Sequence, residues 1–428
     1  MPRATIESLD REGRGVARRD GKAVFVEGGL TGETVEYSIL RNKPSFDIGR
    51  VETVLEPSAE RVDPRCRFFG ICGGCAMQHL DARAQVAAKQ RVLEDALWHV
   101  GRVRPETMLR AIYGDAWEYR HRARLSVRNV PKKGGVLVGF HERKSSYVAD
   151  MTGCEVLPAP VARLLPELRT LVGGLSIRDR LPQIEVAVGD RVTVLVLRVL
   201  EAPTATDGDA LRRFAEASGV QLWLQPGGPA TAAPFWPKDA SALDYVLPDF
   251  GVRIGFLPTD FTQVNHGVNR VLVRRAMTLL DPRPSERVGD FFCGLGNFTL
   301  PIARLGADVT GFEGNAGLIE RARANARANG LECDFRAIDL FDAAACAQLP
   351  AFDKALLDPP RDGAIELVKS FATHPPRTIV YVSCDPATLA RDAGVLVQTQ
   401  GYRLVAAGAV NMFPHTAHVE SIALLERG

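Results

Sequence analysis

Apolar and polar positions alternate in short runs along the first 57 residues of the chain. Residues 34–40 read Thr-Val-Glu-Tyr-Ser-Ile-Leu, and a period of two is typical of a strand with one buried face. The runs are separated by Gly13, Gly15, Gly21, Gly28 and Gly32. Because such closely spaced turn positions favour short strands, residues 1–57 are predicted to form a small all-β barrel with an OB-like fold.

The pattern of residues 58–255 is mixed. A helical stretch runs from Asp81 to about Val100, and strand-like apolar runs cover residues 184–188 and 192–199. Residues 226–239 are rich in Pro, Gly and Ala and are predicted to be a loop. We therefore expect an α+β central domain.

In residues 256–428 strands alternate with helices, which is typical of a doubly wound parallel sheet in a Rossmann-like α/β domain. An apolar strand over 288–293 leads into a tight glycine turn. The next strand covers 308–313, and a third ends at Asp339. Open α/β sheets bind ligands at the carboxyl ends of their strands, so we expect a ligand site there.

Composition indicates an ordinary soluble globular protein. The 428 residues are 46% hydrophobic and 24% charged, which suits about two or three domains. No apolar run approaches membrane-spanning length, and no apolar stretch follows Arg3 at the N-terminus. We expect a cytoplasmic protein without membrane contact, and nothing indicates an obligate protein partner.

Positive charge is concentrated in the N-terminal part, although the net charge is only +2. Residues 1–160 carry 26 Lys and Arg against 21 Asp and Glu, and the remainder carries 27 against 30. In the densest stretch Arg120, Arg122 and Arg124 alternate, so a strand would place all three on one face. The stretch is either a phosphate-facing rail for a nucleic acid or a solvated sheet face with scattered ion pairs.

The glycine turn predicts a cradle for a small molecule. Gly294 and Gly296 allow close backbone approach to a ligand, Asn297 follows, and Glu313 lies 17 residues beyond Gly296, where it suits a ribose diol. A third glycine for a dinucleotide pyrophosphate is missing, so S-adenosylmethionine fits better. The alternative is that Glu313 and Asp339 are surface carboxylates that cap helices.

Four short motifs of the last third carry nucleophilic and acid–base chemistry. These motifs are Asp358-Pro359-Pro360-Arg361, Ser383-Cys384-Asp385-Pro386, residues 415–420 (His-Thr-Ala-His-Val-Glu) and the glycine turn. An Asp-Pro directly after a strand creates a sharp turn, which favours an exposed Cys384 over a structural buried cysteine. For Glu420 the alternative is an ordinary exposed glutamate of a strand.

Four cysteines form a candidate metal site: Cys66, Cys72, Cys75 and Cys154. In a reducing compartment clustered cysteines are better interpreted as ligands or catalysts than as disulfides. Four thiolates suit zinc or an iron–sulfur cluster equally. Phe68, Phe69 and Ile71 would shield such a group from water. Unligated buried cysteines are the alternative.

These motifs, together with Phe261-Thr-Gln-Val-Asn and Phe413-Pro414, resemble the RNA 5-methyluridine methyltransferase family. The resemblance covers nearly the whole chain and is greatest for the iron–sulfur-containing 23S ribosomal RNA (uracil-C5)-methyltransferases with an N-terminal TRAM domain. It implies a class I methyltransferase domain and an enzyme of class EC 2.1.1. It also favours a [4Fe-4S] cluster over zinc.

The resemblance implies a role for each motif residue. Cys384 would add to uracil C6 and Glu420 would remove the C5 proton, while Asp358 would bind the uracil edge or the cofactor's amino group. S-adenosylmethionine would be held by Gln263, Phe292, Gly294, Asn297, Glu313 and Asp339. The RNA would present a flipped or unpaired uridine.

Two other classes of function remain open at this point. One is methylation of transfer-RNA uridine or of cytosine C5. A non-catalytic iron–sulfur RNA-binding protein is less compatible with the presence of both Cys384 and Glu420. A radical S-adenosylmethionine enzyme needs an open iron, which four protein thiolates do not leave.

Overall fold

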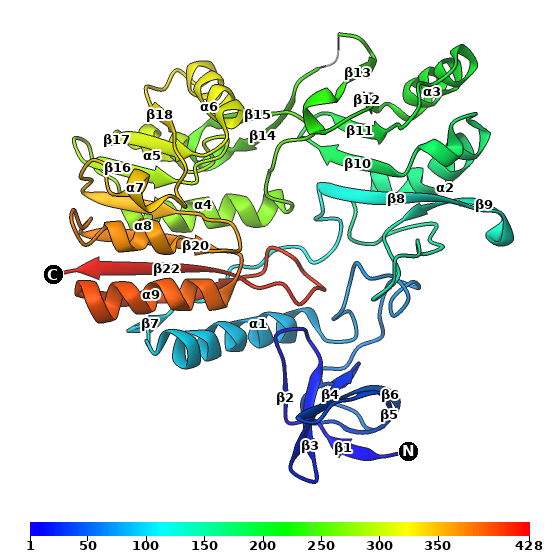
Figure 1. Ribbon diagram of the computed structural model, residues 1–428, viewed down its shortest axis with the longest axis horizontal. Helices are drawn as coiled ribbons and strands as arrows, with labels where there is room; N and C mark the ends of the chain where they lie inside the picture. Colours follow the sequence, from blue (N-terminus) through cyan, green and yellow to red (C-terminus); the bar gives the residue numbers. More distant parts are fainter. Residues whose placement is uncertain (240) are drawn as a thin grey trace.

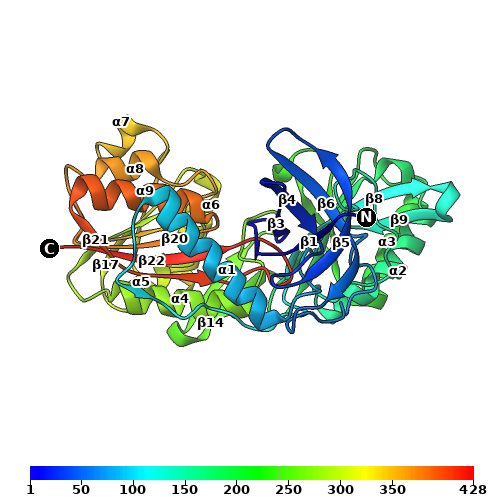
Figure 2. The ribbon, with the colours of Figure 1, turned by 90° about the horizontal axis from the view of Figure 1, so that it is seen from below.

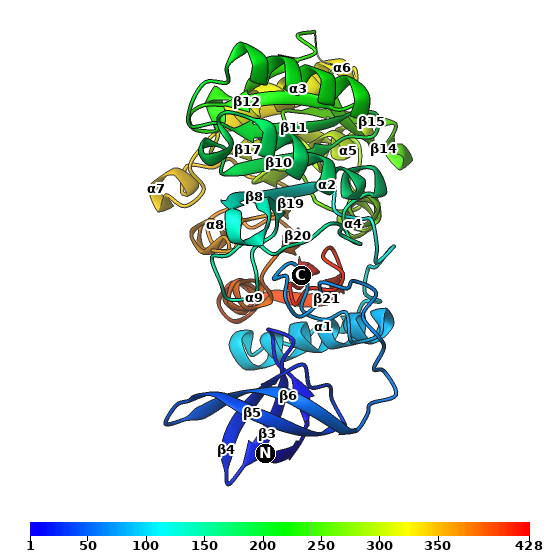
Figure 3. The ribbon, with the colours of Figure 1, turned by 90° about the vertical axis from the view of Figure 1, so that its right-hand side faces the viewer.

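The N-terminal strands form one six-stranded sheet in the computed structural model, which describes residues 1–239 and 241–428. In the order β1-β5-β6-β4-β3-β2 the strands are β1 (Arg3–Thr5), β5 (Thr34–Asn42), β6 (Phe46–Glu56), β4 (Lys22–Glu27), β3 (Gly15–Arg19) and β2 (Ser8–Leu9). Ile6, Val26 and Tyr37 are buried in its core. This sheet lies at one end of the molecule, beyond helix α1 (Figure 3).

A second six-stranded sheet lies in the middle of the chain. Its strands, in the order β13-β12-β11-β10-β8-β9, are β13 (Ala233–Trp236), β12 (Gln221–Gln225), β11 (Thr193–Arg198), β10 (Gln183–Val188), β8 (Arg122–Val130) and β9 (Gly135–Gly139). Helices α2 (Ala159–Gly174) and α3 (Ala205–Ser218) pack on it. The prediction that 226–239 is a loop is wrong at β13, an edge strand, where prolines such as Pro234 are tolerated.

The C-terminal sheet has eight strands in the order β18-β17-β16-β19-β20-β22-β21-β7. They are β18 (Asp334–Ala337), β17 (Asp308–Glu313), β16 (Arg287–Phe291), β19 (Lys354–Leu357), β20 (Thr378–Ser383), β22 (Glu420–Arg427), β21 (Tyr402–Val410) and β7 (Thr107–Met108). The first five are parallel as predicted, whereas β22 is antiparallel to both neighbours. An α/β fold with a class I methyltransferase strand order results.

Helices cover both faces of this sheet (Figure 2). They are α4 (His266–Leu280), α5 (Thr299–Arg304) and α6 (Ala316–Ala328) on one face, and α1 (Ala82–Ala96), α7 (Ala343–Cys346), α8 (Ile365–Ser370) and α9 (Pro386–Gln400) on the other. Val380 and Val382 of β20 are buried against the helices of the first face, and Ile379 and Tyr381 are buried against those of the other face. Because both faces are buried, the strand has a continuous apolar run.

Parts of the predicted central domain, 58–255, pack with the C-terminal sheet (Figure 1). Helix α1 contacts α9 and β21, and β7 pairs with β21. The hairpin of β14 (Leu243–Leu247) and β15 (Val252–Phe256) packs on α6. The predicted domain limits are 1–57, 58–255 and 256–428. Elements α1, β7, β14 and β15 lie within 58–255 in the sequence but pack with the C-terminal sheet and its helices.

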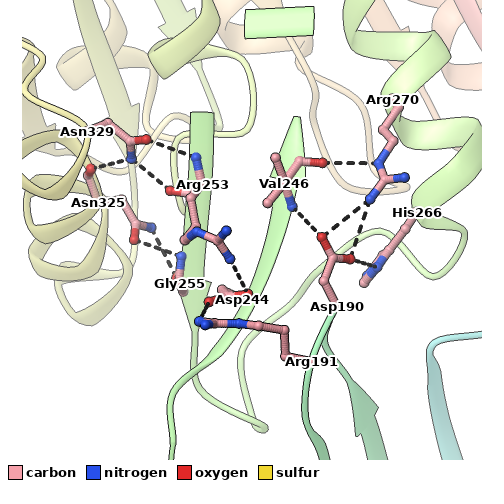
Figure 4. A network of polar contacts seen from close by, with 10 residues as sticks. All are labelled: Asp190, Arg191, Asp244, Val246, Arg253, Gly255, His266, Arg270, Asn325 and Asn329. Atoms are coloured by element: carbon pink, nitrogen blue, oxygen red, sulfur yellow. Dashed lines mark hydrogen bonds and ion pairs between the residues drawn. The ribbon is translucent and has the colours of Figure 1, made fainter. Parts of the chain in front are cut away.

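Ion pairs link the central sheet to this hairpin (Figure 4). Asp190, in the turn between β10 and β11, pairs with Arg270 of α4 at 3.3 Å. Arg191 and Arg253 both contact Asp244 of β14, at 2.7 and 2.8 Å. These contacts fix the hairpin beside the carboxyl ends of the C-terminal sheet. No helix in the described part of the chain has the length and apolarity needed to cross a membrane.

Candidate active site

A cavity of about 510 Å³ opens at the carboxyl ends of β16, β17, β19 and β20. All nine predicted catalytic and cofactor-binding residues line it: Gln263, Phe292, Gly294, Asn297, Glu313, Asp339, Asp358, Cys384 and Glu420. The parallel strands bring these residues together although up to 157 positions separate them in the sequence. The cavity is large enough for a nucleoside-sized ligand beside a flipped base.

The floor of the cavity is the glycine turn after β16. Phe292 adopts a φ of 65° and Gly294 a φ of 54°, and no atom lies within 4 Å of where a Cβ on Gly294 would be. A left-handed conformation at a bulky residue such as Phe292 is strained and must be imposed by its surroundings. The turn thus exposes backbone to the cavity, which suits close approach of a ligand.

Asn297 is fixed in orientation by three hydrogen bonds. Its Oδ1 accepts from the Tyr245 hydroxyl at 2.9 Å and from Asn269 Nδ2 at 2.9 Å, and its Nδ2 donates to Asn269 Oδ1 at 3.1 Å. These contacts leave one amide hydrogen of Asn297 for a ligand. The Asn297 side chain is therefore held rigidly at the cavity and can donate one hydrogen bond to a ligand.

The two carboxylates at the strand ends are not helix caps. Glu313 accepts hydrogen bonds from the backbone N–H groups of Asn315 (2.9 Å) and Gly294 (3.3 Å), and Asp339 accepts from Phe341. Helix α6 is capped by Asn315 and helix α7 by Asp342 instead. The alternative interpretation of Glu313 and Asp339 as caps is wrong, because both line the cavity.

Asp358, directly after β19, is a carboxyl group in an apolar environment. Burial raises its pKa to about 7, and the nearby carboxyl of Asp290 adds to this shift. Asp290 is itself fully buried beneath the turn, where it accepts a hydrogen bond from the Thr299 hydroxyl. A carboxyl with a pKa near neutrality can donate a hydrogen bond in its protonated form.

Cys384 and Glu420 lie at the adjoining ends of two neighbouring strands, and both line the cavity. Ser383 of β20 pairs with Ser421 of β22, so the next positions outward in this antiparallel ladder are Cys384 and Glu420. Cys384 is half-buried, and Asp385 behind it caps helix α9. The turn after β20 thus presents the thiol to the cavity and excludes a structural core cysteine.

The electrostatics of this pair depend on burial and on neighbouring carboxyls. Burial raises the pKa of Cys384 to about 11, with further increases from Glu420 and Asp358, while Arg361 lowers it. Glu420 is 5% exposed, and its Oε2 has no hydrogen-bond partner within the described residues. Burial and Asp358 raise its pKa to about 8. The alternative of an exposed strand glutamate is therefore wrong.

The four predicted metal-ligating cysteines line a second, small cavity of about 20 Å³ with Phe68, Phe69 and Phe140. Burial raises the pKa of Cys75 to about 12 and of Cys154 to about 11, and the other thiols of the group contribute. No three His, Cys, Asp or Glu side chains in the described ranges converge on a single metal ion. Ile71 is 56% exposed, so its predicted shielding role is wrong.

Four thiols that line one largely apolar cavity are a ligand set that suits either a zinc ion or an iron–sulfur cluster. Each thiolate destabilises the others, so a cationic group between them would remove that repulsion. The residues present therefore fit an iron–sulfur cluster.

The predicted arginine rail is only partly present. Strand β8 begins at Arg122, so Arg120 lies before it and lines the cysteine cavity. Arg122 donates to the carbonyl of Pro258 at 2.6 Å, and Arg124 pairs with Glu185 at 3.1 Å. Arg122 and Arg124 therefore fit the interpretation of a sheet face with scattered ion pairs and backbone contacts. Arg128 is exposed and stays available for a phosphate.

Several cavity-lining residues escaped the sequence interpretation. Tyr245 and Phe341 line the cavity but belong to no recognisable motif. Arg361 belongs to the Asp-Pro-Pro-Arg motif, but its effect on the pKa of Cys384 was not predicted. Its place in that motif was the sequence signal that could have indicated it.

Comparisons with known proteins agree with this geometry. A tRNA (uracil-5-)-methyltransferase family model matches residues 252–428, and a TRAM domain model matches residues 2–51. The chain is 61% identical to the 23S rRNA (uracil(1939)-C(5))-methyltransferase RlmD of Aromatoleum aromaticum, with 100% of both chains covered. Identity to the protein of that name from Dechloromonas aromatica is 57%, again over 100% of both chains.

A solved structure supports the fold along the whole chain. The tRNA (uracil-54, C5)-methyltransferase of Pyrococcus abyssi, in complex with S-adenosyl-L-homocysteine, superimposes with a TM-score of 0.76. The alignment covers 99% of this chain and 100% of that chain at 22% sequence identity.

Proposed function

Because this chain belongs to the RNA 5-methyluridine methyltransferase family, we propose that it methylates C5 of a uracil in 23S ribosomal RNA with S-adenosylmethionine as methyl donor. Relatives 61% and 57% identical over their full length are named for uracil 1939 of this RNA. The same uridine is the target we propose here. The observation that carries the mechanism is that Cys384 and Glu420, at the adjoining ends of β20 and β22, line one cavity.

Cys384 would act as the nucleophile. Uracil C5 is too poor in electrons to attack a methyl sulfonium, but a thiolate bonded to C6 converts the ring into an enolate that is nucleophilic at C5. Arg361 favours the thiolate, whereas burial disfavours it.

Asp358 would stabilise the enolate. Since the pKa of its carboxyl is raised to about 7, a protonated Asp358 can donate a hydrogen bond to a uracil oxygen as negative charge develops there. The same carboxyl, when ionised, accepts from an amino group.

Glu420 would complete the reaction as general base. After the C5–methyl bond has formed and S-adenosylhomocysteine has been released from the sulfonium, C5 still carries its proton. Glu420 accepts that proton, the electron pair re-forms the C5–C6 double bond, and the C6–sulfur bond breaks to return Cys384. Atoms and charge balance without any oxidant or reductant.

The donor would lie across the glycine turn. Glu313 suits the ribose hydroxyls, because its carboxylate faces the cavity beside Gly294. Asp339, Phe292 and Gln263 line the same cavity and would hold the rest of the donor. The turn contains no third glycine, which is consistent with a ligand that has no pyrophosphate.

The cysteine cavity would hold a [4Fe-4S] cluster through Cys66, Cys72, Cys75 and Cys154. When bound, such a group supplies a covalent connection between the segment 66–75 and Cys154. Methyl transfer involves no net redox change, so these four residues would serve the fold and RNA contacts. Zinc is the alternative occupant.

The RNA would bind with the target uridine unpaired or flipped out of its helix, because the thiol lies inside a cavity. The TRAM sheet and exposed cations such as Arg128 would contact phosphates. Methylation of transfer RNA or of cytosine is the alternative within the same chemistry.

Purified enzyme should be incubated with labelled S-adenosylmethionine and ribosomal RNA from a strain that lacks this gene, and methylated positions should be mapped by mass spectrometry. We expect one methyl group on uracil C5 of 23S RNA. Incorporation into transfer RNA alone, or into cytosine, would overturn the assignment.

A further inference from the structure

A buried lysine of helix α1 holds the loop that leads into Glu420. Lys89 is 2% exposed. Its Nζ donates to Asn411 Oδ1 at 2.7 Å and to the carbonyl of Phe413 at 2.8 Å, both in the loop between β21 and β22. The side chain reaches this loop from a part of the sequence more than 320 residues away. No sequence motif identified it.

Gln85, one helical turn before Lys89, contacts the same loop. Its Nε2 donates to the carbonyls of Met77 and Leu80, and its Oε1 accepts from the backbone N–H of His415 at 2.8 Å. The carbonyl of His415 accepts in turn from Ala76 and Met77. Residues four apart on a helix share one face, so α1 presents a polar pair to this loop.

A buried ammonium is costly unless a partner compensates for its lost hydration. Burial lowers the pKa of Lys89 to about 7, and Glu420 is the group that raises it. Conversely, Lys89 is the cation that lowers the pKa of Glu420 against burial and Asp358. The two side chains therefore stabilise each other's charged forms.

Other charged groups near this pair come from every neighbouring element. Asp358 after β19 and Cys384 after β20 face Glu420, whereas His415 and His418 of the loop lie within the field of Lys89. Arg361 acts on Cys384 and on His418. Within the described residues, Lys89 is the cation that lowers the pKa of Glu420.

We propose that Lys89 is a positioning residue for Glu420: it anchors the loop that leads into β22 and places a positive charge beside that loop. The proposal rests on the function proposed above, in which Glu420 removes the C5 proton. It assigns to α1, which ends 324 residues before Glu420 in the sequence, a part in that step.

The test compares Lys89→Gln and Lys89→Met with Arg91→Met. Arg91 lies on the same helix but is exposed and paired with Asp95, so its variant removes a like charge far from the loop. Glutamine retains a donor for Asn411 and Phe413 but not the charge. The measured quantity is the rate at which the methylated covalent adduct on ordinary RNA breaks down, as a function of pH.

In Lys89→Gln we expect the pH midpoint of adduct breakdown to rise, with a loss of about tenfold at neutral pH per unit of that rise. The loss should shrink as the pH increases, and KM for RNA and for S-adenosylmethionine should not change. Lys89→Met should show the same shift plus a lower plateau. Arg91→Met should match the wild type.

An unshifted pH midpoint in a folded, active Lys89→Gln enzyme would overturn the proposal, as would a loss equal at every pH, which indicates a structural role alone. If the wild-type enzyme itself forms no methylated adduct, the proposed function fails instead. Circular dichroism and thermal melting establish that each variant is folded.

Discussion

Replacement of Glu420 by glutamine removes the proposed base while it preserves the shape of the side chain. Cys384 can still add to C6 and the methyl group can still be transferred, but the C5 proton has no acceptor. A methylated covalent adduct between protein and RNA should therefore accumulate. Wild-type enzyme should show little of it at steady state.

The expected slowing of adduct breakdown follows from the contribution of a general base and from the pKa of Glu420. A general base contributes about 10²- to 10⁴-fold to a proton transfer, so adduct breakdown in Glu420→Gln should slow by about this factor. With a pKa of about 8, Glu420 in the wild type is ionised in about one molecule in ten at pH 7. Wild-type breakdown should thus increase about tenfold between pH 7 and pH 9, and the variant should lack this increase.

The assay is rapid quenching of a single turnover on an ordinary RNA, followed by denaturing electrophoresis and mass analysis of the adduct. Because a raised carboxyl pKa lowers native stability as the pH rises from the unfolded value through about 8, the variant should melt no lower than the wild type at pH 8. Rapid turnover in Glu420→Gln would refute the assignment of the base.

Three further variants test the surroundings of this pair. Glu313→Ala should weaken binding of S-adenosylmethionine about ten- to hundredfold, as expected for loss of a hydrogen bond to a charged group, and unchanged affinity in calorimetry would remove Glu313 from the ribose site. Tyr245→Phe deletes the hydroxyl that holds Asn297, so affinity for the same ligand should fall about two- to tenfold, and no fall would mean that Asn269 suffices. Cys66→Ser should abolish a broad absorption near about 400 nm if the wild-type protein contains an iron–sulfur cluster, whereas a colourless wild-type protein with bound zinc would contradict the cluster.

Much of the C-terminal fold could be predicted because each strand carries its own signal. The run ending at Glu313 is apolar and ends in an acid, and β17 has the predicted bounds. The direction of β22 could not be predicted, since pairing with β20 is decided by contacts distant in sequence. Edge strand β13 was missed because its prolines favour a loop locally.

Some residues of the candidate site could be predicted from the sequence, and others could not. Cys384 and Asp358 each follow a strand directly, so the topology of a parallel sheet predicts that they meet. Lys89 and Tyr245 lie on elements whose position depends on tertiary packing of α1 and the β14–β15 hairpin. Arg120 was misplaced because strand β8 begins two residues later than the alternation of arginines suggests.

The most direct test of the account is to trap the sulfur on the pyrimidine. Wild-type enzyme incubated with 5-fluorouracil-containing RNA and S-adenosylmethionine should form a covalent adduct, because fluorine at C5 cannot leave as a proton. Digestion and mass spectrometry should locate the nucleotide on the peptide that contains Cys384, and Cys384→Ala should form none. An adduct on another residue, or full methylation of ordinary RNA by Cys384→Ala, would contradict the mechanism.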